Sequence, residues 1–236
     1  MLRLVMDEIP TADKTADPRV TRPDLQPAFE AAEARWSANW AAGPSRRRWS
    51  ELPLQAGDAA PDLELDGTDG EPVRLMSLWR ERPALLLFWR HWGCGCGTDR
   101  AERLRDEHPT LVEAGANVVV VGQGDPGRAG WYQEAFSLPC PVLVDADESA
   151  YKAFGLLEMS PWILSGEPTL DEAERRATIT RHRARGRPVA DNPFLLPGEF
   201  VVNRDGRLVL TYRYQYCDNF PDIDTLVDSI REAAAS

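Results

Sequence analysis

The sequence predicts an α/β protein built on a central mixed β-sheet with helices on its faces. Two short, continuously apolar runs, ALLLFW at 84–89 and ANVVVVG at 116–122, are typical of strands that are buried on both faces of a sheet. A charged segment of helix-forming residues separates them, so the unit is β-α-β and its strands are expected to be parallel. Near the C-terminus, the run 199–214 places Asp-Gly between two strand patterns, which predicts a hairpin.

Two predicted segments precede this pattern. Residues 1–24 are rich in Pro, Asp and Thr and lack an apolar period, so we expect a mobile arm. Residues 25–56 are expected to form a helical extension followed by a linker. The reason is that Phe29, Ala32 and Trp36 recur at the three- and four-residue spacing of an amphipathic helix packed on the domain.

Alternating strand and helix patterns begin at residue 57, and we expect one domain from 57 to 236. A basic segment interrupts the alternation and predicts an insertion at about 158–196. The pattern predicts further elements at these places: a hairpin around 63–75, a strand at 141–144, and helices at 129–136, 148–154 and 223–234.

Composition and charge exclude several classes of protein. Asp and Glu number 38 against 27 Lys and Arg, and the net charge of -11 argues against nucleic acid and anionic membranes as partners. No run approaches the roughly 18 apolar residues of a membrane span, and the first residues lack the apolar core of a signal peptide, so we expect a cytoplasmic protein. Four cysteines are too few for a disulfide scaffold and favour redox chemistry or metal binding.

Cys94 and Cys96 lie one glycine apart in FWRHWGCGCGTDR, directly after the first predicted strand. A helix is expected to begin here, and the unpaired N–H groups and dipole of a helix N-terminus favour a thiolate over a thiol. Thr98 or Asp99 is expected to cap its first turn. The neighbouring glycines leave room around the sulfur atoms and permit unusual backbone angles. The pattern indicates a pair of reactive thiols.

Two other uses of these residues stay open from the pattern alone. Copper and zinc prefer thiolate and imidazole ligands, so the cysteines could form a metal site. The candidate ligands are Cys94, Cys96, Cys217 and either His91 or His182. Alternatively, the protein is redox-inactive and binds a partner, with the Arg-rich segment 175–187 in contact with an anionic surface. Cys140, between two prolines, is expected to be a buried structural residue.

Five segments carry a family resemblance: GDAAPDLELDGTDGEPVRLMSLW, ALLLFWRHWGCGCGTDRAERLR, VVVVGQGDP, FSLPCPVLVDADESAYKAFGL and PGEFVVNRDGRLV. In this order they resemble peroxiredoxin-like members of the thioredoxin superfamily, the alkyl hydroperoxide reductase and thiol-specific antioxidant group. The resemblance covers about residue 57 to the C-terminus, apart from the insertion. It implies a thioredoxin-like fold.

The resemblance also implies a thiol-dependent oxidoreductase with an antioxidant role. In such proteins a first cysteine attacks a peroxide or disulfide and a nearby cysteine resolves the product, which makes Cys94 the nucleophile and Cys96 the resolver. A dithiol reductant such as thioredoxin is the implied partner, no metal or other cofactor is implied, and homodimer formation is left open. The residues expected to shape the site are His91, Trp92, Gly95, Thr98, Arg100, Pro197 and Gly198, with Cys217 as a third thiol.

The sequence departs from the family pattern at three places. Leu87 and His91 stand where family members have a proline and a threonine or serine. Pro197 lies close to the position of the cis-proline that faces the active site of thioredoxins, and we expect it to take that place. The arginine that family members carry before the last hairpin is missing, and Arg90 or Arg100 is expected to replace it.

Overall fold

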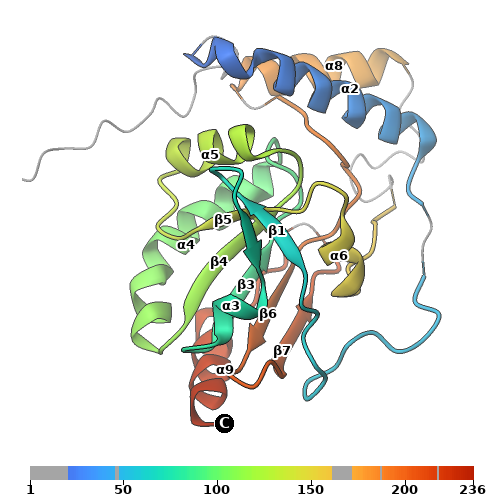
Figure 1. The fold of residues 1–236 in the computed structure, drawn as a ribbon. Coiled ribbons are helices and arrows are strands. Elements are labelled where there is room, and N and C mark those ends of the chain that lie inside the picture. The colour runs from blue at the N-terminus through green and yellow to red at the C-terminus, as the bar shows by residue number, and fades with distance from the viewer. Residues whose placement is uncertain (1–20, 46–47, 161–171, 187, 217) are drawn as a thin grey trace, which may run out of the picture.

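A computed structural model describes residues 21–45, 48–160, 172–186, 188–216 and 218–236. In this part of the chain, one mixed sheet of seven strands has the order β2-β1-β5-β4-β3-β6-β7, with helices on both faces (Figure 1). The strands are β1 (Glu64–Gly67), β2 (Pro72–Arg74), β3 (Ala84–Phe88), β4 (Asn117–Gly122), β5 (Val142–Val144), β6 (Gly198–Val202) and β7 (Leu208–Arg213). The helices are η1 (Pro23–Leu25), α2 (Gln26–Ala42), α3 (Met76–Trp79), α4 (Gly95–Glu113), α5 (Pro126–Ala135), α6 (Ser149–Ala153), α8 (Glu172–Ala184) and α9 (Ile223–Ala235). The predicted α/β class is confirmed.

The middle of the sheet is the β3-α4-β4 unit. β3 pairs in parallel with β4, and β4 pairs in parallel with β5. β6 pairs antiparallel with β3 on the other side and continues into the β6–β7 hairpin. The structure therefore confirms the parallel unit and the C-terminal hairpin. It also places the loop that follows β3 at the edge of the sheet where the parallel strands end, the usual position of sites in α/β proteins.

Alternate residues of β3 enter two separate cores, which explains its continuous apolar run. Leu85 and Leu87 belong to the core beneath α4, α5 and α9. Leu86 and Phe88 belong to the core on the opposite face, beneath α3 and α6. Because successive side chains of a strand point to opposite faces, a strand buried on both faces has no polar positions. The rigid strand β3 thus carries the turn that contains the two cysteines.

α2 packs on the first of these cores. Phe29 is 1% exposed and meets the ring of Trp131 edge to face, with ring centroids 5.8 Å apart. α8 lies beside α2 in Figure 1, and Arg183 of α8 forms an ion pair with Glu33 of α2. A helix is therefore present where the extension predicts one. Most of the predicted arm lies outside the described residues, and the boundaries between arm, extension and domain stay predictions.

Candidate active site

The turn between β3 and α4 carries the two thiols. α4 begins at Gly95, and Cys94 is its N-cap residue with extended backbone angles of φ −75° and ψ 135°. The Cys94 N–H donates to the His91 carbonyl at 3.0 Å, which closes the turn. The predicted cap at Thr98 or Asp99 is wrong, because the helix begins earlier and both residues lie inside it. This start places the first cysteine at the positive end of the helix dipole.

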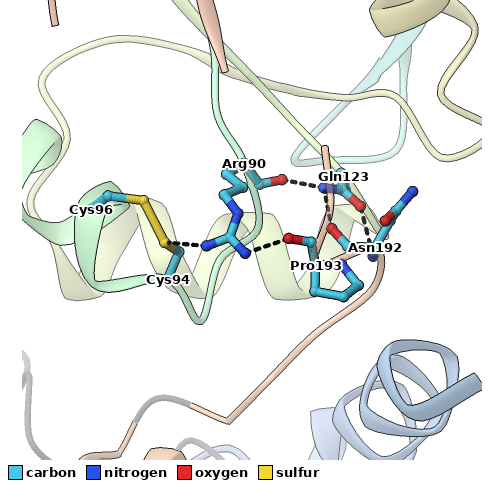
Figure 2. The surroundings of a disulfide bond; sticks show 6 residues. All are labelled: Arg90, Cys94, Cys96, Gln123, Asn192 and Pro193. Atoms are coloured by element: carbon cyan, nitrogen blue, oxygen red, sulfur yellow. Dashed lines mark hydrogen bonds between the residues drawn. A yellow bond between two sulfur atoms is a disulfide. The ribbon is translucent and has the colours of Figure 1, made fainter. Parts of the chain in front are cut away.

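Cys94 and Cys96 are joined by a disulfide, with their Cα atoms 5.4 Å apart (Figure 2). Cys94 is 5% exposed and Cys96 is 9% exposed, whereas Gly95 between them faces solvent. The turn therefore presents its backbone to solvent and keeps both sulfur atoms inside. A reactant must reach the sulfurs through the side chains that surround them.

The guanidinium of Arg90 lies against the sulfur of Cys94. Its Nη1 donates to the Cys94 Sγ at 2.9 Å, and its Nη2 donates to the Pro193 carbonyl (Figure 2). Arg90 is 6% exposed, so water screens its charge weakly. A cation in this position favours the thiolate form of Cys94. Of the two arginines expected near the thiols, Arg90 is the one in contact with the sulfur.

Arg100 is held by carboxylates instead. Its Nε donates to Glu199 Oε1 at 2.8 Å and its Nη1 donates to Glu107 Oε2 at 2.9 Å. The Tyr214 hydroxyl donates to the same Glu199 carboxylate. Burial alone would lower the pKa of Arg100, but its acidic neighbours, with Glu199 the strongest, together raise that pKa above its usual value. Arg100 is therefore a charged structural partner of the sheet and does not contact the sulfur of Cys94.

A narrow pocket lies beside Cys96, and its walls include Trp89, Pro197 and Phe220. The expectation that Pro197 takes the place of a cis-proline is wrong, since no peptide bond in the described ranges is cis. The Pro197 carbonyl accepts from the Tyr214 N–H at 3.1 Å, so this residue extends the β6–β7 pairing. Its neighbour Gly198 is the first residue of β6. A Cβ at this position would overlap the side chain of Leu156.

Residues that the sequence analysis did not single out surround Arg90. The Gln123 amide Nε2 donates to the Arg90 carbonyl and, at 3.2 Å, to the Asn192 carbonyl. A polar residue directly after a buried parallel strand is a signal that could have identified Gln123. Asn192 and Pro193 lie in the predicted insertion, where no sequence pattern indicated that they reach the cysteines. Only the fold brings Pro193 to Arg90 and Asn192 to Gln123.

Trp92 and two glycines determine the path of the turn. The Trp92 Nε1 donates to the Gln123 backbone carbonyl at 2.7 Å, and a Cβ at Gly122 would overlap the Trp92 ring. A Cβ at Gly93 would overlap the carbonyl oxygen of Pro188. Backbone and ring approach so closely at both places that only glycine fits. These contacts hold the turn against the end of β4 and against the end of the insertion.

His91 and Thr98 are buried polar residues of the turn and the first helical turns. Among the described residues, neither His91 Nδ1 nor Thr98 Oγ1 has a hydrogen-bond partner. Burial, followed by the charge of Arg90, lowers the pKa of His91 well below its usual value. The imidazole is therefore neutral at pH 7, and it adds no positive charge beside Cys94. Its backbone carbonyl closes the turn.

The other predicted thiols differ in what the structure says of them. Burial raises the pKa of Cys140 to about 12, so this side chain stays a protonated thiol at neutral pH. Cys217 lies outside the described residues, and its role as a third thiol stays a prediction. Within the described ranges, no group of three or more His, Cys, Asp or Glu side chains could hold a metal ion. The copper or zinc alternative also involves Cys217 and stays a prediction.

α8 carries most of the predicted basic segment. Arg175 and Arg176 pair with Glu172 of the same helix, and Arg183 pairs with Glu33 of α2. These arginines are thus paired within the chain, and contact with an anionic partner stays a prediction. No helix in the described part is long and apolar enough to cross a membrane. The cytoplasmic location also stays a prediction.

The fold and the cysteine pair define a thiol oxidoreductase with a thioredoxin-like fold. The AhpC/TSA family model matches residues 56–211, well over half of the 236 residues. The chain therefore belongs to the AhpC/TSA family, as a peroxiredoxin-like member of the thioredoxin superfamily. The predicted family is confirmed.

Individual relatives agree with this assignment. Peroxiredoxin Bcp of Bacillus subtilis (strain 168) is 26% identical over 146 residues, which cover 56% of this chain and 92% of the relative. Peroxiredoxin Bcp of Escherichia coli (strain K12) is 32% identical over 104 residues, which cover 44% of this chain and 66% of the relative. The crystal structure of peroxidoxin BcpB from Mycobacterium tuberculosis shares the fold, with a TM-score of 0.55 and 19% identity over 76% of this chain and 97% of that one.

Proposed function

We propose that the chain reduces a small hydroperoxide, with Cys94 as the attacking thiolate and Cys96 as the resolving thiol, and that a dithiol such as thioredoxin restores the pair. The observation that carries the proposal is the Arg90 guanidinium at 2.9 Å from the Cys94 sulfur, at the N-cap of α4. The cation and the helix dipole both stabilise negative charge on this sulfur. The peroxiredoxin names of the relatives support the same chemistry.

The proposed cycle balances in three steps. The Cys94 thiolate attacks the terminal oxygen of the hydroperoxide, the O–O bond breaks, and the alkoxide takes up a proton and leaves as an alcohol, with Cys94 oxidised to a sulfenic acid. The Cys96 sulfur then attacks the Cys94 sulfur, which forms the disulfide and releases water. A dithiol finally reduces this disulfide by exchange and becomes oxidised itself. The disulfide of the structure corresponds to the product of the second step.

The enclosure of Cys94 supports a small oxidant rather than a protein disulfide. Its sulfur is covered by Arg90, and Arg90 in turn is covered by Pro193. A disulfide on a folded partner would have to reach this covered sulfur, whereas the dithiol reductant can attack the sulfur of Cys96, which lies beside the pocket. A hydroperoxide needs space for only a few atoms.

Serine substitutions at the two cysteines test the proposal. Cys94→Ser is expected to abolish hydroperoxide-dependent oxidation of a dithiol, because no sulfenic acid can form. Cys96→Ser should retain the first step, so that dimedone traps a sulfenic acid at Cys94, while turnover with the dithiol falls. Cys140→Ala is the control and should keep the parent rate, since this thiol is buried and protonated. Unchanged turnover in Cys94→Ser would contradict the proposal.

A further inference from the structure

We infer that Gln123 is a positioning residue: its side-chain amide holds residues 188–193, the covering segment, against Arg90 and so aims the Arg90 guanidinium at Cys94 (Figure 2). The inference rests on the proposed function, because it takes Cys94 to act as a thiolate. Gln123 acts through Arg90, which stands between it and the sulfur in Figure 2.

The covering segment packs directly on the turn that carries the thiols. All of its residues are buried. At one end, the Pro188 carbonyl lies so close to Gly93 that a Cβ there would overlap it. At the other end, the Pro193 carbonyl accepts from Arg90. The segment is thus a packed part of the site, and its position determines where the acceptor for the Arg90 side chain lies.

The Gln123 amide pairs with the main chain of this segment in both directions. Its Oε1 accepts from the Asn192 N–H at 2.9 Å, and its Nε2 donates to the Asn192 carbonyl at 3.2 Å. The same Nε2 donates to the Arg90 carbonyl. Gln123 is 2% exposed, so water does not compete for these hydrogen bonds. One buried amide therefore joins the cysteine-bearing turn to the covering segment.

Both ends of Arg90 depend on this arrangement. Gln123 binds its backbone carbonyl, and Pro193, the neighbour of Asn192, binds its Nη2. The remaining amino group, Nη1, is the one on the Cys94 sulfur. A shift of the Pro193 carbonyl would therefore move the positive charge away from the thiolate. The cost would appear as a higher pKa of Cys94.

The surroundings of Gln123 allow it to be replaced without loss of the fold. Asn192 is also anchored by its own side chain, whose Nδ2 donates to Glu148 at 3.0 Å and to Glu158 at 2.7 Å. Gln123 and Asn192 line a cavity of about 440 Å³ beneath α2, which leaves room for a side chain of similar length. Gln123→Met should therefore fold and lose only the amide contacts.

The test measures the pKa of Cys94 from the pH dependence of its alkylation by iodoacetamide. The reduced protein carries Cys96→Ser, and modification at Cys94 is followed by peptide mass spectrometry. Gln123→Met is expected to raise this pKa by about one unit. The matched control is Gln133→Met. It also removes a hydrogen bond from a side-chain amide to a backbone carbonyl, that of Cys140 at 2.9 Å, and it should leave the pKa of Cys94 unchanged.

A double-mutant cycle shows whether Gln123 acts through Arg90. Arg90→Met should raise the pKa of Cys94 at least as far as Gln123→Met does, and the double variant should go no further. Additive shifts, or an unchanged pKa in Gln123→Met, would overturn the inference. If Gln123→Met does not fold, Gln123→Asn, which shortens the amide by one methylene, is measured in the same way and with the same criterion.

The failure of the proposed function would look different. In that case the disulfide-competent parent protein would consume no hydroperoxide, whatever the pKa of Cys94 in the variants. The two results are read from separate assays, one of turnover and one of alkylation.

Discussion

His91 lies in the turn between β3 and α4 with 5% of its surface exposed, and no residue that the structure describes forms a hydrogen bond with its Nδ1. Burial is the main cause that lowers the pKa of its imidazole, and the charges of Arg90, His182 and Arg128 lower it further. Protonation would add a cation to a buried region that already holds guanidinium groups. The folded protein therefore keeps this ring neutral, whereas the unfolded chain takes up a proton at about pH 6.5.

This difference predicts how stability depends on pH. The unfolded state binds the proton and the folded state does not. The contribution of the neutral His91 to stability is therefore fully present above about pH 6.5 and is lost as the pH falls below that value. The free energy of unfolding should decrease by up to about 1.4 kcal/mol per pH unit through His91. Urea unfolding between about pH 7 and pH 5 should show a flatter profile for His91→Leu.

The control for this prediction is His108→Gln. His108 is only partly buried, and its pKa is lowered by that partial burial. Its removal should therefore change the pH profile less than the removal of His91. Equal slopes for the parent protein and His91→Leu would show that the buried imidazole does not titrate on unfolding.

At the scale of elements, Asp191 joins parts of the fold that are distant in sequence. Its carboxylate accepts from Arg128 of α5 and from Arg35 of α2, each at 2.8 Å, and its N–H donates to the Ala32 carbonyl of α2 at 2.9 Å. Arg128 is fully buried, and although burial lowers its pKa, the carboxylates of Asp191 and Asp125 together raise it above its usual value. Asp191 has a φ of 55°, a left-handed conformation that Asp and Asn adopt more readily than most residues.

Asp191→Asn should therefore destabilise the fold through charge rather than backbone strain. The substitution retains a residue that tolerates the left-handed conformation but removes the main counter-ion of a buried guanidinium. We predict a loss of about 3 kcal/mol in the free energy of unfolding, measured in urea. Arg35→Met, at the half-exposed partner, should cost less than about 1 kcal/mol. Similar losses in both variants would contradict this explanation.

The elements were predictable from sequence because apolar periodicity is local, and β3, β4 and the β6–β7 hairpin lie where their runs indicate. The start of α4 shows a first limit: Thr98 has a suitable side chain for a cap, yet the preceding turn ends at Cys94. The contact between Arg90 and Pro193 shows a second, since 103 residues separate them. No local pattern encodes which part of an insertion packs over the thiols. The thiol pair was therefore predictable from sequence, whereas the covering segment was not.

At the scale of the whole molecule, α2 lies outside the family match but inside the core. The match begins at residue 56, whereas Phe29 of α2 is as buried as the residues of the central strands. Burial of an aromatic ring against Trp131 and Tyr132 ties the helix to α5. We therefore expect α2 and the sheet to unfold together, in one cooperative transition.

Phe29→Ala tests this expectation. Removal of the buried ring should lower the free energy of unfolding by about 3 kcal/mol, with circular dichroism and tryptophan fluorescence still reporting one midpoint. Leu52→Ala is the control, since Leu52 is 88% exposed and its loss should change stability by less than about 0.5 kcal/mol. Two separate transitions would show instead that α2 is a detachable layer.

The thiol of Cys94 and the positive charge beside it come from one short stretch of chain, since Arg90 precedes Cys94 by four residues. A graft of residues 88–100 onto another thioredoxin-like sheet would transfer both groups together. It would leave behind Gln123 and the covering segment, which come from two other parts of the chain. Such a chimera would carry the sulfur and the guanidinium without the parts that keep them in contact. The reactivity of the turn therefore belongs to the assembled domain, and copying the motif alone would not reproduce it.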